Sequence, residues 1–365
     1  MKSLLTLCSI VFIAYNAHTQ NIWIADNRPT APTGTHIFAD VTAAIAAASP
    51  GDIIHVIPSQ FVYPDFTVTK DSLTIFGIGY NPNKEQPGIS SITNVTIDIG
   101  TFGTRLSGLD ISVLNIGTSA TGSLGNIFIE NCQVNSIEGN ICCGETTVSN
   151  IIIRNCVLGQ NQVSTTHTIN LNDTDIFSTS VVITNNIIMG SSTTSSGGYG
   201  SINVTDAIVK NNLFIGNGST NDFAFNNVQT STISNNIFLG RQPISDARTG
   251  EVINCTFNNN ITFGATINAF PTGNGNTASA NQEGVDPVLV NVPIVDDWDF
   301  TYDPSPDTGS PAIGAGNDTN DIGVTGGTIP YSPTGTPLPV IQVLRLPEII
   351  QEGTDTNATI EAEGN

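Results

Sequence analysis

A short pattern containing asparagine recurs six times at nearly constant intervals, and no other feature constrains the fold as strongly. Each copy has an apolar residue, a variable residue, an asparagine, and then a second asparagine or a cysteine. The intervals between successive first asparagines are 24, 30, 26, 24 and 24 residues. Short β-type runs separated by turn residues fill these intervals, which excludes helical solenoids, whose units are longer and follow a 3.6-residue period. The first asparagines are Asn131, Asn155, Asn185, Asn211, Asn235 and Asn259.

One such unit fits one coil of a parallel β-solenoid, in which three short strands alternate with turns. We therefore predict an all-β fold, a single-stranded parallel β-helix with about 24 residues per coil. In such a stack each strand pairs with its copy in the next coil. Asparagine tolerates a left-handed turn, and its amide can bond to neighbouring coils. The six first asparagines are thus expected to form a structural ladder.

The ends of a solenoid need caps, because the end coils leave strand edges unpaired. Asp40 followed by an Ala-rich run predicts a short N-capped helix that closes the N-terminal end. We accordingly predict a signal peptide at 1–20, a parallel β-helix domain at 21–331, and a Pro-rich linker with C-terminal tail strands at 332–365. Within the β-helix domain we expect an N-terminal cap at 36–51, ladder coils at 73–264, and C-terminal coils and cap at 286–331.

The N-terminal segment has the features of an export signal. Lys2 precedes an apolar run from Leu4 to Ala14, which is too short to span a bilayer. We expect a secreted, extracellular protein without a transmembrane segment, with the periplasm or the cell surface as further locations. Loss of this segment with Cys8 would leave five of the six cysteines, an odd number, so at least one thiol should lack a partner within the chain.

The charge balance restricts the partners of this acidic chain. Ten basic residues stand against 31 acidic ones, for a net charge of −21. A nucleic-acid partner is excluded because phosphate neutralisation needs a basic face, and an anionic membrane surface is equally unfavourable. Polyuronates would also be repelled unless calcium bridged the two. The balance favours a neutral glycan.

Two stretches and the Asn-rich coils resemble a known group of proteins. The stretches run from His36 to Tyr63 and from Trp298 to Gly327. Together they resemble secreted right-handed parallel β-helix proteins of the pectate-lyase-like superfamily, in the style of Bacteroidetes-type bacteria. The resemblance covers about 21–331. It implies a right-handed coil and a polysaccharide or cell-surface glycan as partner, while the superfamily includes lyases, glycosidases, esterases and adhesins.

The variable position of each repeat should face outward. Stacking would place Glu130 beside Arg154, with Lys210 two coils further, roughly 10 Å away. Similarity to pectate lyases, which combine calcium-binding acids with basic residues, makes these three the candidate catalytic residues. The alternative is a cross-strand ion pair on a solvated face. The Gly-His-Gly and Arg-Ile-Lys strings of polygalacturonase-like hydrolases do not occur in the sequence.

The 30-residue interval between Asn155 and Asn185 contains an insertion that could bind a ligand. Asp173 and Asp175 offer hard oxygens in an Asp-x-Asp arrangement, which makes them candidate calcium ligands. With these two, His167 and Thr184 are the candidate ligand-binding residues. The alternatives are turn-capping aspartates and an ordinary surface histidine. Calcium is the one cofactor that we consider.

The residue two positions before the variable residue is apolar in four consecutive repeats and should also face outward, which would form an apolar stripe on the surface. Its members are Phe128, Ile152, Val182 and Ile208. An exposed apolar stripe normally marks something bound over it. We expect the tail strand from Val340 to Leu346 to cover it, and a glycan ring or a protein partner is the alternative.

These observations favour an extracellular β-helix protein that recognises carbohydrate or serves as a surface scaffold, without a catalytic motif. The alternative is a polysaccharide lyase or glycoside hydrolase that acts on the outer face of the β-helix. An enzyme would need carboxylates or cations that converge in a cleft.

Overall fold

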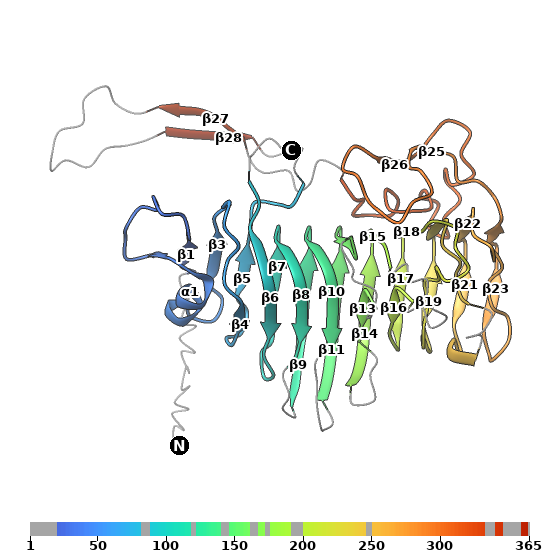
Figure 1. Cartoon of the computed structure of the whole chain (residues 1–365), viewed down its shortest axis with the longest axis horizontal. Helices are drawn as coiled ribbons and strands as arrows, with labels where there is room; N and C mark the ends of the chain where they lie inside the picture. The colour runs from blue at the N-terminus through green and yellow to red at the C-terminus, as the bar shows by residue number, and fades with distance from the viewer. Residues whose placement is uncertain are drawn as a thin grey trace, which may run out of the picture.

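The chain folds into a single-stranded parallel β-helix, as predicted. The computed structural model describes residues 20–81, 88–117, 122–139, 146–160, 167–171, 176–190, 200–245, 250–332, 340–345 and 359–363. Two parallel sheets of 12 strands each form the walls of an elongated solenoid (Figure 1). Residues 1–19 lie outside the described ranges, so the predicted signal peptide stays a prediction.

Sheet A forms one wall, and each of its strands pairs in parallel with the corresponding strand of the next coil. In spatial order its strands are β2 (Ile37–Phe38), β1 (Ile22–Ala25), β3 (Ile53–Val56), β5 (Thr74–Phe76), β7 (Arg105–Ser107), β9 (Ser123–Glu130), β11 (Thr146–Arg154), β14 (Ile176–Thr184), β17 (Ala207–Lys210), β19 (Thr232–Ser234), β21 (Thr256–Asn258) and β23 (Thr277–Ser279).

Sheet B forms the remaining walls of the solenoid. Its strands are β4 (Phe66–Val68), β6 (Ser91–Ile97), β8 (Asp110–Ile116), β10 (Gln133–Gly139), β12 (Val157–Leu158), β15 (Ile187–Ile188), β18 (Leu213–Ile215), β20 (Ile237–Leu239), β22 (Ile261–Phe263) and β24 (Gln282–Glu283); β13 (Ile169–Asn170) pairs with β10, and β16 (Ile202–Asn203) pairs with β13. β10 pairs with β12 through its first residues and with β13 through Ile137 and Glu138. The two halves of sheet B therefore face different directions.

Like side chains stack on like side chains inside the solenoid. The central inward row of sheet A is fully buried at nine successive rungs: Ile54, Ile75, Leu106, Ile129, Ile153, Ile183, Val209, Ile233 and Phe257. Burying each of these side chains contributes about 1.5–3 kcal/mol relative to an exposed one. In sheet B, the rings of Phe214 and Phe238 stack with centroids 4.7 Å apart. This column is the core that holds the coils together.

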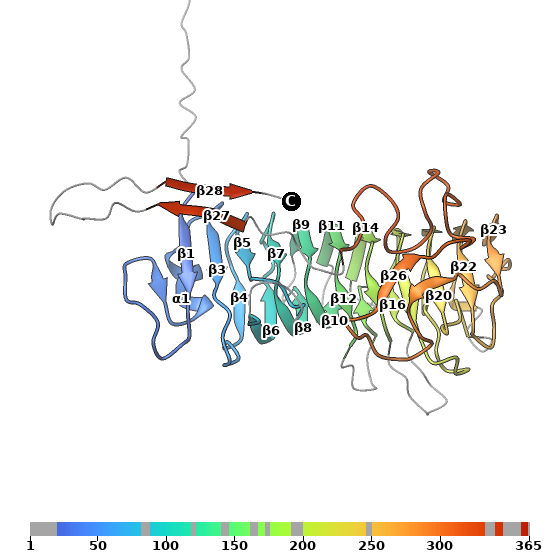
Figure 2. The same ribbon diagram turned by 90° about the horizontal axis from the view of Figure 1, so that it is seen from above.

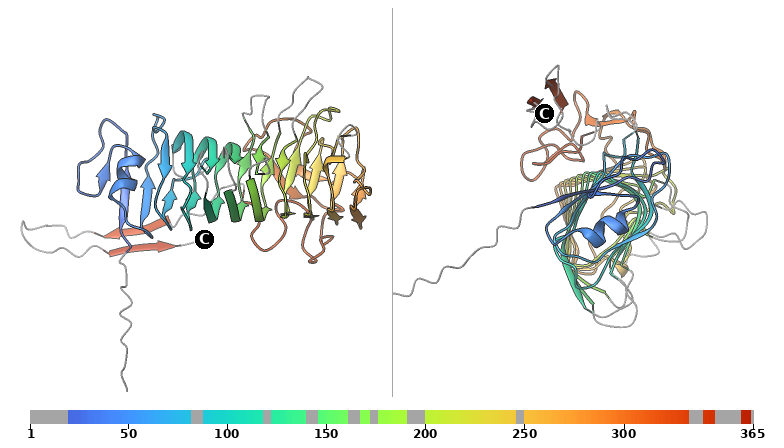
Figure 3. Two further views of the ribbon diagram at one scale, coloured as in Figure 1. Left: turned by 90° about the horizontal axis from the view of Figure 1, so that it is seen from below. Right: turned by 90° about the vertical axis from the view of Figure 1, so that its left-hand side faces the viewer.

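A short helix closes the N-terminal end. Helix α1 (Val41–Ala47) begins after Asp40, whose carboxylate accepts a hydrogen bond from the backbone N–H of Ala43. It buries Val41, Ala44 and Ile45 against the first coil. The end view in Figure 3 shows the helix lying across the opening of the solenoid.

The six first asparagines occupy the same turn in successive coils. All of them adopt left-handed backbone conformations, with φ between 51° and 56°. At most of these rungs the backbone N–H of the asparagine donates to a carbonyl of the following coil, as from Asn185 to Lys210 and from Asn211 to Ser234. Asparagine suits this turn because it accepts positive φ at little cost.

The ladder of stacked amides, however, belongs to the second position of the repeat, in the coils where that position is asparagine, which corrects our prediction. The Nδ2 group of each member donates to the Oδ1 atom of the next, at 3.0 Å in every step. The same Oδ1 also accepts from the backbone N–H of the preceding member. The ladder consists of Asn186, Asn212, Asn236, Asn260 and Asn281. Its first four members are fully buried, so the interior column, and not the turn column, carries the amide contacts.

A second column of left-handed residues lies five positions before the first asparagines, within β9, β11 and β14 and just before β17, β19 and β21. Its members are Asn126, Asn150, Ser180, Asp206, Thr230 and Asn254, with φ between 50° and 60°. Their intervals equal those of the first asparagines, 24, 30, 26, 24 and 24. The four sheet A residues between the two turns are thus fixed at both ends in every coil.

Residues 289–331, here called the strap, do not continue the coils, in contrast to the C-terminal coils expected at 286–331. Strands β25 (Leu289–Asn291) and β26 (Asp303–Pro306) form an antiparallel pair. The strap then runs back along the outside of the second half of the solenoid (Figures 1 and 2). It follows that this segment is a cover and not an extension of the stack.

The strap buries an apolar row that the sequence analysis did not single out. The row lies on the outer face of sheet B, in register across five coils: Val157, Ile187, Leu213, Ile237 and Ile261. Against it pack Trp298, Ile322, Val324 and Tyr331 of the strap, all at most 4% exposed. Tyr80 joins the same cluster from the first half of the chain, and its ring lies 5.7 Å from that of Phe300.

A buried arginine strengthens the attachment of the strap. Arg241 is fully buried, and its Nε donates to the carbonyl of Ile215 at 2.7 Å. Its guanidinium lies 4.0 Å from the carboxylates of Asp222 and of Asp296 in the strap. Burial lowers the pKa of Arg241, and the two carboxylates oppose that effect.

The tail forms a separate two-stranded antiparallel sheet of β27 (Val340–Arg345) and β28 (Thr359–Glu363). Of the expected cysteines, Cys132, Cys156 and Cys255 are buried free thiols, while Cys142 and Cys143 lie outside the described residues. Burial raises the pKa of Cys132 to about 12. In the part of the chain that the structure describes, no helix combines the length and apolar character needed to cross a membrane.

Candidate functional site

The variable repeat positions form a single row on the outer face of sheet A, in the register that the sequence predicts. Strand pairing places them on successive rungs: Ser107, Glu130, Arg154, Thr184, Lys210, Ser234 and Asn258. Two positions earlier on the same strands runs a parallel row that contains Arg105, Phe128, Ile152, Val182 and Ile208. These two rows make up the candidate face.

Glu130 lies between two arginines near the middle of this face. One carboxylate oxygen accepts from Nε of Arg105, and the other accepts from Nε and Nη2 of Arg154 at 2.8 and 2.6 Å. The Glu130 side chain is only 7% exposed, whereas those of Arg105 and Arg154 are 45% and 25% exposed. The outer ends of two guanidinium groups therefore face solvent while the carboxylate between them does not.

The environment of Glu130 keeps it ionised. Burial raises its pKa, but the hydrogen bonds from Arg105 and Arg154 lower it by more, so the pKa lies below the 4.5 of an ordinary glutamate. A carboxylate with a lowered pKa and both oxygens occupied is a poor proton donor and a poor proton acceptor at neutral pH. Glu130 thus orients the two arginines.

The third catalytic candidate does not join this pair. Nζ of Lys210 lies 2.8 Å from Oδ2 of Asp318 in the strap. Burial raises the pKa of Asp318, but the hydrogen bonds from Lys210 and Asn320, together with the charge of Lys210, lower it below the ordinary value. Lys210 is therefore paired with a strap residue, and the structure does not bring Lys210 together with Glu130 and Arg154.

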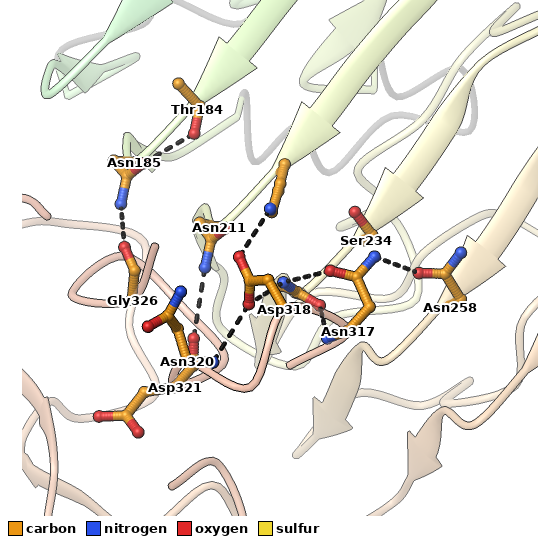
Figure 4. A network of polar contacts seen from close by, with 12 residues as sticks. Thr184, Asn185, Asn211, Ser234, Asn258, Asn317, Asp318, Asn320, Asp321 and Gly326 are labelled. Atoms are coloured by element: carbon orange, nitrogen blue, oxygen red, sulfur yellow. Dashed lines mark hydrogen bonds and ion pairs between the residues drawn. The ribbon is translucent and has the colours of Figure 1, made fainter. Parts of the chain in front are cut away.

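The strap also covers the C-terminal part of the face (Figure 4). The Nδ2 group of Asn185 donates to the carbonyls of Val324 and Gly326, and that of Asn211 to the carbonyls of Asp321 and Gly323. Further along, Asn235 exchanges hydrogen bonds with Asn317. The left-handed asparagines thus present their amides outward as anchors for the strap, and the accessible part of the charged row ends near Thr184, whose hydroxyl donates to Oδ1 of Asn185.

The apolar row remains partly open. Phe128, Ile152 and Val182 are half-buried, and Ile208 is 49% exposed. The guanidinium carbon of Arg105 lies 5.9 Å from the centre of the Phe128 ring. Ile208 is open to solvent, so the tail strand does not cover the whole stripe as expected.

His167 lies elsewhere, on the far half of sheet B. It is 7% exposed, with Nδ1 2.7 Å from the carbonyl oxygen of Gly200 and Nε2 3.3 Å from Nδ2 of Asn226. These contacts give it a structural environment away from the arginines. Asp173 and Asp175 lie outside the described residues, so the calcium prediction stays a prediction. Within the described ranges, no three His, Cys, Asp or Glu side chains are grouped to hold a metal ion.

Sequence reasoning missed Arg105 and Asp318 as partners of the candidate residues. Arg105 lies on the neighbouring row, two positions before Ser107, and reaches Glu130 only because its long side chain crosses to the next rung. Its basic character beside an apolar row was the available signal. Asp318 lies in the strap, and its contact with Lys210 depends on the path of the strap, which the repeat does not predict.

Comparison with known proteins assigns no activity. No protein-family model matches the sequence, and no curated protein matches it. A solved structure described as a rhamnogalacturonan lyase is 14% identical, with a TM-score of 0.28, and the match covers 75% of this chain and 64% of that one. A PL6 family alginate lyase is 15% identical, with a TM-score of 0.21, and the match covers 65% and 52% of the two chains. The chain thus spans less than two thirds of either protein.

Proposed function

We propose that this chain binds a glycan on the outer face of sheet A and does not cleave it. One observation carries the proposal: Glu130 is enclosed by Arg105 and Arg154, so that its carboxylate holds two exposed donor groups in place. Guanidinium groups can donate hydrogen bonds to sugar hydroxyls. The adjacent Phe128 offers a ring against which the apolar face of a sugar can pack.

The state of the candidate catalytic residues supports binding over cleavage. An enzyme of the lyase or hydrolase class requires a base or an acid and base pair that can exchange protons with the substrate. Here Glu130 and Lys210 each have a charged partner at hydrogen-bond distance. The net charge of −21 favours a neutral polysaccharide or cell-surface glycan. The export signal read from the N-terminal sequence supports an extracellular location.

A glycan array followed by a reducing-end assay, with and without calcium, tests the proposal. We expect retention of a neutral glycan without release of new ends, and at least tenfold weaker binding by Phe128→Ala, about 1.4 kcal/mol. Phe61→Ala is the matched control, because Phe61 is 47% exposed but does not belong to sheet A. Release of unsaturated or reducing ends that is lost in Arg154→Ala would instead establish the lyase or hydrolase alternative.

A further inference from the structure

The outer face of the far half of sheet B carries a continuous row of hydrogen-bonding side chains. Strand pairing places one of them on each of five successive rungs: Thr67, Thr96, Asn115, Glu138 and Asn170. All five residues are half-buried, and the Oδ1 atom of Asn170 accepts a hydrogen bond from Nδ2 of Asn203. The inward neighbours of this row, such as Val95 and Leu114, are fully buried in the core. We call this row the polar track.

The polar track begins in a cleft at the N-terminal end of the solenoid. The cleft has a volume of about 600 Å³ and lies between α1 and the first rungs of sheet B. Thr67 and Thr96 of the track line it, together with Thr42 and Ile45 of the helix. This volume is within the range of roughly 300–1,000 Å³ that is common for ligand sites.

A paired aspartate and asparagine add directional groups to this cleft. The Nδ2 group of Asn94 donates to one carboxylate oxygen of Asp65 at 2.7 Å, and its backbone N–H donates to the other at 2.9 Å. Asp65 is exposed and Asn94 half-buried, so the remaining acceptor and donor positions of the pair face the cleft that both residues line. Such a pair can accept from one hydroxyl and donate to its neighbour.

We infer that the cleft and the polar track form a second binding site, for the chain of a neutral polysaccharide. The rungs repeat about every 4.8 Å, a length close to that of one sugar unit, so successive units can meet successive hydroxyl, amide and carboxylate groups. Five rungs span roughly 19 Å, four such steps. The ligand is neutral because the site contains two carboxylates, those of Asp65 and Glu138, and the chain carries a net charge of −21.

This inference does not rest on the proposed function of sheet A. The track uses no residue of that face, and the two sheets present their outer sides in different directions, as the end view shows (Figure 3). The strap covers the other half of sheet B, where the outward row is apolar from Val157 to Ile261. The polar track is therefore a distinct surface of the same molecule.

Isothermal titration with neutral hexasaccharides of glucose, mannose and xylose tests the inference. At least one of the three should bind, and the corresponding trisaccharide should bind at least tenfold more weakly, because it meets fewer rungs. Thr96→Tyr, which places a ring across the track, should weaken binding of the hexasaccharide at least tenfold. Thr308→Tyr is the matched control, an exposed threonine of the strap that belongs to neither proposed binding surface, and should bind as the wild type does.

Asn115→Ala, a smaller change, should give an intermediate loss with an unchanged melting temperature. Absence of binding to all three hexasaccharides, or equal binding by Thr96→Tyr and the wild type, would overturn the inference. Binding that is lost in Phe128→Ala and retained in Thr96→Tyr would leave the sheet A proposal standing and remove this one. The reverse result would remove the sheet A proposal alone.

Discussion

Buried amide side chains join one coil to the next at a corner of the solenoid. Asn212 accepts from both the backbone N–H and the Nδ2 group of Asn186, and donates to the Oδ1 atom of Asn236. The backbone N–H of Asn186 has no strand partner here, because it lies in the turn. The side chain of an interior asparagine thus links the turns of successive coils by hydrogen bonds, as main-chain pairing links their strands.

Asn212→Leu should therefore lower the free energy of unfolding by about 2–4 kcal/mol, since it leaves several buried donors and acceptors without partners. Denaturant titration of the purified protein measures this change. The control is Asn131→Gly, which keeps the left-handed turn at a half-buried position and should alter the stability by about 0.5 kcal/mol or less. Equal losses in both variants would contradict the ladder.

The lowered pKa of Glu130 predicts a pH dependence. A carboxyl whose pKa is lower in the folded than in the unfolded state contributes stability above its unfolded pKa, and that contribution disappears as the pH falls through the folded pKa. Glu130→Gln should thus be less stable than the wild type by about 1 kcal/mol at pH 7. The difference should shrink as the pH falls below 4.5, the ordinary glutamate value. A constant difference measured from neutral to acidic pH would refute this account.

The sequence contained enough information to separate the two asparagines of each repeat, although their intervals are identical. The first position is asparagine in all six copies, as a left-handed turn requires. The second position accepts Cys132 and Cys156, which are among the most readily buried residue types. That substitution indicates the interior, where the ladder in fact lies. Contacts between rows, such as Arg105 with Glu130, depend on side-chain length and rotamer and do not follow from the repeat.

At the level of elements, the strap is attached by contacts of two kinds. Its apolar side packs on the outer row of sheet B, and its backbone carbonyls accept hydrogen bonds from the outward amides of the turn column. Trp298 is the largest buried side chain in this contact, 2% exposed, with its ring 5.5 Å from Tyr302 and 6.5 Å from Tyr331.

Trp298→Ala should loosen the strap and leave the first half of the solenoid intact. We expect a loss of about 3–5 kcal/mol in the free energy of strap docking. Hydrogen exchange should then quicken in 312–326 and in the covered strands β15, β18, β20 and β22, while β6 and β8 exchange as before. Phe61→Ala, an exposed aromatic outside the contact, is the control. Uniformly faster exchange along the whole chain would show that the strap and the coils unfold as one unit.

At the level of the whole molecule, the coiled architecture was predictable because it repeats, and the cover was not because it occurs once. Six copies of one pattern fix the register of sheet A, including the outward row from Ser107 to Asn258. The strap has no copy, and its turn-rich composition resembles that of a coil. One signal was present: the residue after the Asn-Asn or Asn-Cys pair is apolar in five of the six copies, at 157, 187, 213, 237 and 261, on a face that a bare solenoid would expose.

The strap also sets an order of events during synthesis. The outer row from Val157 to Ile261 is synthesised before Trp298, Ile322 and Val324. The five apolar side chains of this row therefore stay exposed until the strap has been synthesised. A product truncated before 289 would keep those positions permanently bare and would be prone to aggregate. The strap thus shields an apolar surface of coils that precede it in the chain.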